Sequence, residues 1–128
     1  MGYKRYAVWR KTENYMSGTP TQIVDDVRRV LQAIGRGNYD RPYLTAYQIF
    51  QALPDGLRAR LILEYGQSGK GAGQYYSAAS AVATAAEILK NRNEVEISML
   101  ATVGLEINTD HGRIEAGNPN VGLYRLRD

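Results

Sequence analysis

The spacing of apolar residues changes near residue 91, and this change limits the architectures that the chain can adopt. Between residues 23 and 89 apolar side chains recur every three or four positions, whereas from Val95 to Ile107 every odd position is apolar. The first spacing is typical of amphipathic helices, and the second is typical of a strand with one buried face. The sequence therefore predicts an α+β fold, mainly helical, in which a run of helices is followed by a C-terminal β-hairpin.

The first helix is expected over residues 23–34, because Gly35 follows its last apolar position and is a natural helix stop. Thr19 or Thr21 is expected to cap its N-terminus. The aromatic-rich residues 3–11, which come before it, suit a short strand or an arm.

Three more helices are expected before residue 91. Pro54, Asp55 and Gly56 predict a tight turn between the first two of them. The glycine-rich residues 66–73 predict a loop before the third, whose small residues allow a close approach to a neighbouring helix or to a nucleic-acid groove. The expected helices cover residues 44–53, 57–65 and about 74–90.

The C-terminal region is expected to be extended. Its predicted elements are a strand at 95–107, a turn at 108–113, the start of a return strand at 114–116, a turn at 117–120 and a final strand at 121–127.

Composition indicates one globular domain over residues 1–128, with an arm and helix at 1–42 and a second unit at 43–128. The apolar fraction of 44% and the charged fraction of 23% are ordinary for such a domain. The absence of cysteine excludes disulfides and thiolate metal sites. No secretory segment and no apolar run of about 20 residues is present, so the sequence predicts a cytoplasmic protein outside the membrane.

The charge is distributed unevenly along the chain. Residues 1–41 hold eight basic and four acidic residues, a net charge of +4, whereas residues 91–128 hold four basic and six acidic residues, a net charge of −2. A basic front half can attract polyanions such as nucleic acids. A solvated surface of mixed charge accounts for the same numbers.

The sequence departs from common catalytic patterns at named residues. A phosphate-binding P-loop needs glycine where Glu64 stands and Ser or Thr after Lys70, where Gly71 stands. His111 is the only histidine, and no Gly-x-Ser-x-Gly motif occurs. We therefore expect no enzyme, no cofactor and no metal site. The loop at 66–73 is still compatible with either a phosphate cradle or a simple connector.

Tyrosine is unusually frequent, with ten tyrosines against one phenylalanine. A tyrosine suits a half-buried position with a hydrated hydroxyl, so the excess favours interfaces and phosphate contacts, although tyrosines at the edge of a core fit equally.

The order of elements over residues 43–126 resembles the winged helix-turn-helix family. The stretch 44–49 (LTAYQI) is similar to the opening of such a unit, and the ending Gly122-Leu123-Tyr124-Arg125-Leu126 is similar to the last strand of a wing. The resemblance implies a double-stranded DNA-binding protein, such as a small transcriptional regulator, which could be a homodimer. The helix at 74–90 would then be the recognition helix.

The resemblance also implies which residues contact DNA. Groups near base edges would come from the recognition helix, phosphate contacts from basic residues before it, and a minor-groove contact from the hairpin tip. In that order the residues are Gln74, Tyr75, Ser77, Ser80 and Thr84, then Arg58, Arg60 and Lys70, then Arg113.

Two features oppose a DNA partner. The expected recognition helix has no Arg or Lys before Lys90, and the hairpin carries Glu106, Asp110 and Glu115, which repel phosphate. The alternative is a protein-interaction module, such as an accessory or inhibitor protein, without nucleic-acid binding. A continuous positive face on the helix favours DNA, whereas a buried helix or a neutral apolar face favours a protein partner.

Overall fold

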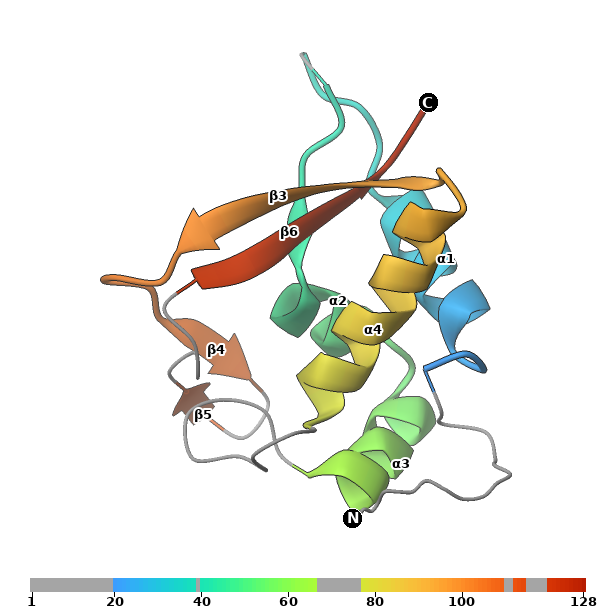
Figure 1. Ribbon diagram of the computed structural model, residues 1–128. Helices are drawn as coiled ribbons and strands as arrows, with labels where there is room; N and C mark the ends of the chain where they lie inside the picture. The colour runs from blue at the N-terminus through green and yellow to red at the C-terminus, as the bar shows by residue number, and fades with distance from the viewer. Residues whose placement is uncertain (1–19, 39, 67–76, 110–111, 115–119) are drawn as a thin grey trace.

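The computed structural model describes residues 20–38, 40–66, 77–109, 112–114 and 120–128. The predicted α+β class is confirmed, since helices fill the first part of the described chain and antiparallel strands the last part (Figure 1). The described helices are α1 (Val24–Ala33), α2 (Ala46–Ala52), α3 (Asp55–Tyr65) and α4 (Ala78–Asn91).

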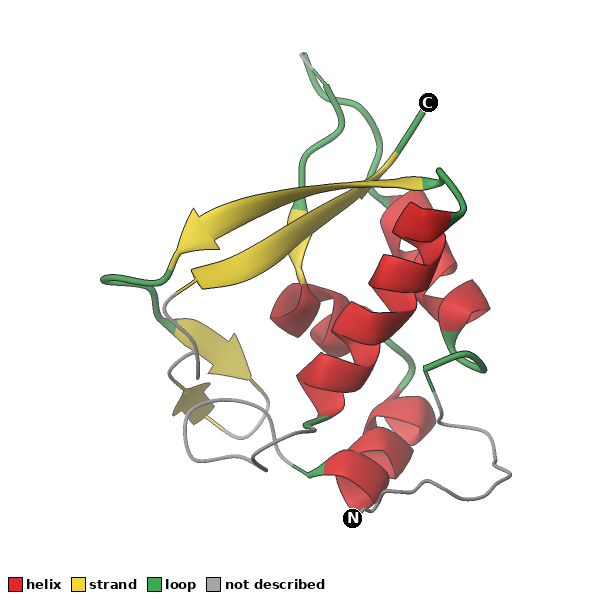
Figure 2. Ribbon diagram, in the orientation of Figure 1, coloured by secondary structure: helices red, strands yellow, loops and turns green. Residues whose placement is uncertain are grey.

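The strands form two small antiparallel sheets (Figure 2). The larger sheet has the order β2–β6–β3, and the smaller one pairs β4 with β5. Their bounds are β2 (Leu44–Thr45), β3 (Val95–Ala101), β4 (Ile107–Thr109), β5 (Gly112–Ile114) and β6 (Asn120–Leu126). The C-terminal hairpin is therefore the β3–β6 pair, with the β4–β5 pair inserted between its strands.

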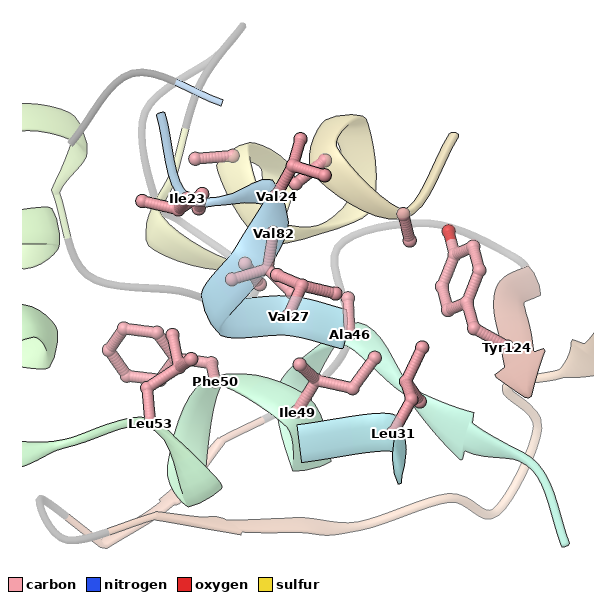
Figure 3. Close-up of a cluster of buried hydrophobic side chains, with 14 of the residues drawn as sticks. Ile23, Val24, Val27, Leu31, Ala46, Ile49, Phe50, Leu53, Val82 and Tyr124 are labelled. Atoms are coloured by element: carbon pink, nitrogen blue, oxygen red, sulfur yellow. The ribbon is translucent and has the colours of Figure 1, made fainter. Parts of the chain in front are cut away.

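The core lies between α4, the other helices and the larger sheet (Figure 3). In α1, Val24, Val27 and Leu31 are buried at the helical spacing that the sequence indicates. From α4, seven residues are buried, and five of them are alanines. These small side chains let neighbouring backbones approach α4 closely, so α4 is the central helix of the described fold.

A capping box fixes the junction between β2 and α2. The Gln48 N–H donates to Thr45 Oγ1 at 3.1 Å, and the Thr45 N–H donates to Gln48 Oε1 at 2.8 Å. These two bonds satisfy backbone donors that a helix start leaves free. The helix expected at 44–53 is confirmed from Ala46 to Ala52, with Thr45 as its N-cap. The expectation that Leu44 belongs to this helix is wrong, because Leu44 pairs with Tyr124 in the sheet.

The expected cap of α1 and the expected tight turn before α3 were also wrong. The N-cap of α1 is Ile23, which makes no side-chain cap bond, so Thr21 does not cap it, and Thr19 lies outside the described residues. Asp55 and Gly56 are the first residues of α3 rather than a tight turn, with Pro54 as the N-cap. Pro54 has φ −57° and ψ 146°, so it stands just outside the helix, and Asp55 in the first turn suits the positive end of the helix dipole.

The long strand expected at 95–107 ends early. β3 stops at Ala101, and a turn follows in which the Leu105 N–H donates to Thr102 O at 2.9 Å and Gly104 has φ +74°. The apolar alternation continues through this turn without burial, since Val103 is 90% exposed. The expected turn at 108–113 and return strand from 114 are replaced by β4 and β5, whereas the final strand is confirmed to within one residue.

Candidate interaction surface

Ser77 caps the N-terminus of α4. Its backbone is extended, and its hydroxyl accepts the Ser80 N–H at 3.2 Å and lies 3.2 Å from the Ser80 hydroxyl. The residue is buried, at 7% exposure. The hydroxyl expected to contact DNA is therefore engaged in starting the helix, as N-cap serines commonly are.

The next two hydroxyls of α4 are also engaged inside the helix. Thr84 Oγ1 donates to the Ser80 carbonyl oxygen at 3.0 Å, and Ser80 shares the contact with Ser77. Both side chains are half-buried. Ala78 and Ala79, in the first turn, are 0% and 5% exposed. Ser77, Ala78 and Ala79 are thus buried, whereas a DNA-reading helix exposes the residues of its first turn to base edges.

A groove of about 420 Å³ lies beside this first turn. It is bounded by α2, the N-terminal half of α4, the C-terminal part of β3 and the N-terminal part of β6. Its walls combine small and apolar residues with five polar ones, which are two tyrosines, two serines and one asparagine. The residues that line it are Ala46, Tyr47, Ser77, Ala79, Ser80, Ala83, Met99, Asn120, Val121, Gly122 and Tyr124.

Tyr124 and Gly122 shape one wall of the groove together. They lie two positions apart on β6, so both point to the same face of the sheet. A Cβ on Gly122 would stand 2.5 Å from Tyr124 Oη and 2.9 Å from its Cζ. The glycine therefore leaves the space that the tyrosine ring occupies. Burial, and the negative charge of Glu87 to a smaller extent, raises the pKa of Tyr124 above its ordinary value.

Met99 forms the exposed rim of the groove. Its side chain is 58% exposed, and it is followed by Leu100 at 39% and Val103 at 90%. Met99 and Leu100 are neighbours on β3 and point to opposite faces of the sheet, so of these three residues only Met99 belongs to the groove.

The basic residues expected to contact phosphate are distributed differently. Arg58 forms an ion pair with Asp55, and Arg113 on β5 forms one with Glu106 at 3.0 Å. Arg60 is exposed on α3. Lys70, Gln74 and Tyr75 lie outside the described residues. The described members of the expected set therefore do not form one continuous positive surface.

The basic front half is also compensated within the fold. On α1, Arg29 pairs with Asp26 at 3.1 Å, and Arg28 binds Glu94, its Nε lying 2.8 Å from Oε1. The bonds from Arg28 lower the pKa of Glu94 below its ordinary value. These pairs reduce the excess of positive charge that the described part of residues 1–41 presents to a polyanion.

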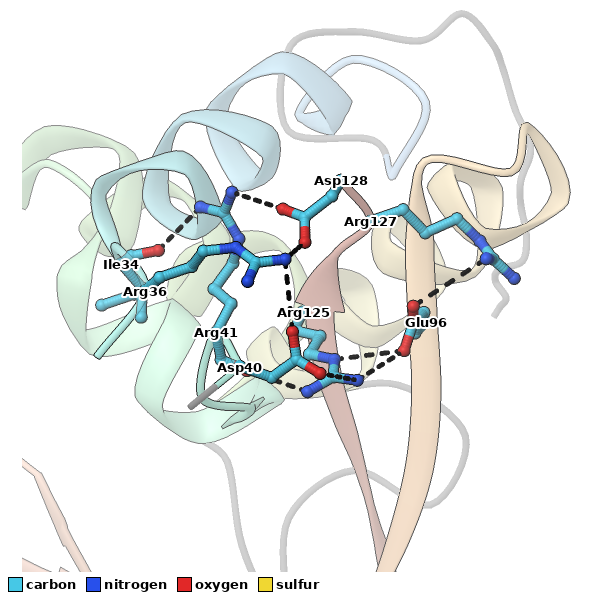
Figure 4. A network of polar contacts seen from close by, with 8 residues as sticks. All are labelled: Ile34, Arg36, Asp40, Arg41, Glu96, Arg125, Arg127 and Asp128. Atoms are coloured by element: carbon cyan, nitrogen blue, oxygen red, sulfur yellow. Dashed lines mark hydrogen bonds and ion pairs between the residues drawn. The ribbon is translucent and has the colours of Figure 1, made fainter. Parts of the chain in front are cut away.

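Figure 4 shows a second group of ion pairs, which joins the loop after α1 to β3 and the end of β6. Arg125 Nη2 lies 2.8 Å from Glu96 Oε1, and the guanidinium stacks 4.5 Å from the centre of the Tyr43 ring. Asp128 binds both Arg36 and Arg41. The arginines here hold the loop to the sheet, so their charge has a structural use.

Comparison with protein-family models, with curated proteins and with solved structures returns no match. No helix in the described part of the chain is both long and apolar enough to cross a lipid bilayer. The described ranges also contain no cluster of three or more His, Asp or Glu side chains that could hold a metal ion.

Proposed function

We propose that this chain is a protein-interaction module that receives an apolar side chain of a partner protein in the groove beside α4. The observation that carries this proposal is the neutral, small-residue face that α4 turns to the groove. Ala79, Ser80 and Ala83 form this face, and Met99 lies opposite. Such a surface gains free energy from burying apolar area and offers phosphate no positive charge.

The size and chemistry of the groove suit a protein ligand. A volume of about 420 Å³ is within the range of about 300–1,000 Å³ that is typical of ligand pockets in proteins. Methionine adapts to ligands of different shape, and tyrosine adds a large contact area with a polar end. Tyr47 supplies such a ring, whereas Tyr124 is buried in the wall at 5% exposure, so the tyrosine excess finds a partial use at this site.

The charge along α4 supports the same partner. The described helix has no charged residue before Glu87, and its first cation is Lys90 near the C-terminal end. A DNA-reading helix presents the groups of its N-terminal turns to bases and phosphates. Here those turns are buried or neutral, which favours an apolar partner over a polyanion.

A matched pair of substitutions tests the groove. Ala83→Arg places a long cation in the groove, whereas Ala59→Arg makes the same change at an exposed position of α3. We expect nuclease-treated lysate to yield a stoichiometric protein partner with the wild type and Ala59→Arg, and not with Ala83→Arg. Equal capture by both variants would reject the groove as the site.

DNA binding is the second candidate, supported by the order of helices followed by a hairpin, on which the winged-helix resemblance rests. In this alternative the chain is a small regulator that binds double-stranded DNA through Arg60 and Lys70. Affinity for random duplex DNA would then fall steeply with salt, and Arg60→Glu with Lys70→Glu would weaken it further. No binding at low salt excludes this candidate.

A further inference from the structure

We infer that the outer edge of β3 pairs with the same edge of a second copy of this chain. In the sheet order β2–β6–β3, the strand β3 stands at one end, and among the described elements only β6 pairs with it. The other end of the sheet is β2, which has only two residues. The long edge on which another strand could add is therefore that of β3.

The hydrogen-bond pattern shows which backbone groups face outward. The Arg127 N–H donates to Glu94 O at 2.9 Å, at the position that continues the β3–β6 register by one step. Bonded and non-bonded positions alternate in an antiparallel pair, so Glu96, Ser98 and Leu100 bond to β6. The backbone groups of the four odd residues then point away from β6. These residues are Val95, Ile97, Met99 and Ala101.

The outward edge lacks the features that usually prevent strand addition. β3 contains no lysine and no proline, and its single charged residue, Glu96, is held by Arg125 of the same chain. Natural edge strands are commonly protected by such residues, by bulges or by shortness. Met99 and Leu100 are instead exposed at this edge. The strand is thus suited to a partner strand.

The sequence of β3 is complementary to itself when it is read in the opposite direction. If a two-fold axis passes between two copies of Ser98, each Val95 faces Ala101 of the other copy and each Ile97 faces Met99. The odd residues, whose backbone N–H and C=O groups point outward, then face each other, as hydrogen bonding between the two strands requires. On the other side of the sheet Glu96 faces Leu100, so no like charges meet. In this register the outward edge of one copy can therefore pair with that of a second copy, which we take as the occupant.

The resulting dimer would have one continuous sheet across the two-fold axis, with each interface formed by the same surface. A single strand pair with a few exposed apolar side chains buries less surface area than a standard protein–protein interface does. We therefore expect a weak dimer, with a dissociation constant on the order of micromolar.

Charge substitutions at the axis test both the dimer and its register. Ser98 is exposed, so Ser98→Lys and Ser98→Glu leave the core of one chain unchanged. In sedimentation equilibrium over a concentration series, we expect wild type to approach twice the 14.3 kDa of one chain. Each variant alone should dissociate roughly fivefold more readily, because like charges then face each other across the strands. An equal mixture of the two should associate at least as well as wild type.

Two further variants serve as controls. Gln32→Lys adds the same charge on an exposed part of α1 and should associate as wild type does. Met99→Pro removes an outward N–H without removing a bond to β6, so it should abolish association. Its circular dichroism should match that of wild type, which separates lost association from lost folding.

Several outcomes would overturn the inference. They are a wild type that stays monomeric at all concentrations, a Ser98→Lys variant that associates as wild type does, and a mixture no stronger than either variant alone. The groove of the proposed function is tested independently by Ala83→Arg. Capture of a partner by a monomeric chain would therefore reject the dimer and leave the groove proposal standing.

Discussion

Replacing Gly122 with alanine tests whether the groove depends on the space that this glycine leaves. The backbone of Gly122 is not in the left-handed region, so alanine is allowed there by its φ angle. The added Cβ would stand 2.5 Å from Tyr124 Oη. Tyr124 is only 5% exposed, so its ring can yield mainly towards the groove that it lines.

Two opposing effects set the size of the change. Alanine restricts the unfolded chain, which alone stabilises the fold by about 0.4–1 kcal/mol. Forcing a buried ring to move costs about 1–3 kcal/mol. The second effect is the larger one, so we expect Gly122→Ala to lower the free energy of unfolding by about 1–2 kcal/mol. The displaced ring should also reduce partner capture.

Urea unfolding followed by circular dichroism measures this difference, with Gly56→Ala as the matched control. Gly56 is in α3, and a Cβ there would meet no atom within 4 Å. Its replacement should stabilise the protein by about 0.5–1 kcal/mol. If Gly122→Ala proves as stable as wild type or more so, the packing of Tyr124 against Gly122 does not have the role assigned to it.

Three other predictions concern the fold that carries the groove. Thr45→Ala removes the capping box of α2 and should cost about 1 kcal/mol in urea unfolding; an unchanged midpoint would contradict it. Leu89→Ala empties a fully buried position and should cost about 2–5 kcal/mol, whereas Leu63→Ala, at a position 86% exposed, should change stability little; equal effects would refute the assignment of the core. The lowered pKa of Glu94 means that its pair with Arg28 contributes stability above the ordinary carboxyl pKa, and this contribution is lost as pH falls through the lowered value. Glu94→Gln should therefore reduce the acid sensitivity of the melting temperature, and an unchanged pH profile would contradict this.

Local patterns in the sequence were sufficient to predict several helices and strands. The apolar spacing in α1 and α4 matches the residues that are buried there, and the last strand was found from its flanking turns and its apolar residues. The start of α2 also depends on a local contact, since its cap Thr45 and the partner Gln48 are only three residues apart. Such signals lie within one element, so they can be read without knowledge of the fold.

Other features depend on contacts between distant parts of the chain. β2 has two residues and exists because Leu44 and Thr45 pair with Tyr124 and Leu123 of β6. Apolar residues continue to alternate through the turn after β3, so the sequence predicted a strand as far as Ile107. The spacing of apolar residues does not by itself show whether they are buried.

The groove also could not be predicted, since its walls come from α2, α4, β3 and β6. One local signal was present: the Gly-x-Tyr spacing at Gly122 and Tyr124 places both residues on the same strand face.

The alanines of α4 give this core an asymmetric response to mutation. Four of them have no exposed surface, namely Ala78, Ala81, Ala85 and Ala86. An alanine has almost nothing to lose by truncation, so cavities cannot be created here, and a glycine costs only about 1 kcal/mol of helix propensity. Any larger residue would instead push apart the helices and the strand that contact α4. Substitutions accepted during evolution should therefore fall mainly at the large aliphatic positions of this core. The distances between α4 and the elements packed against it should change little as the sequence diverges.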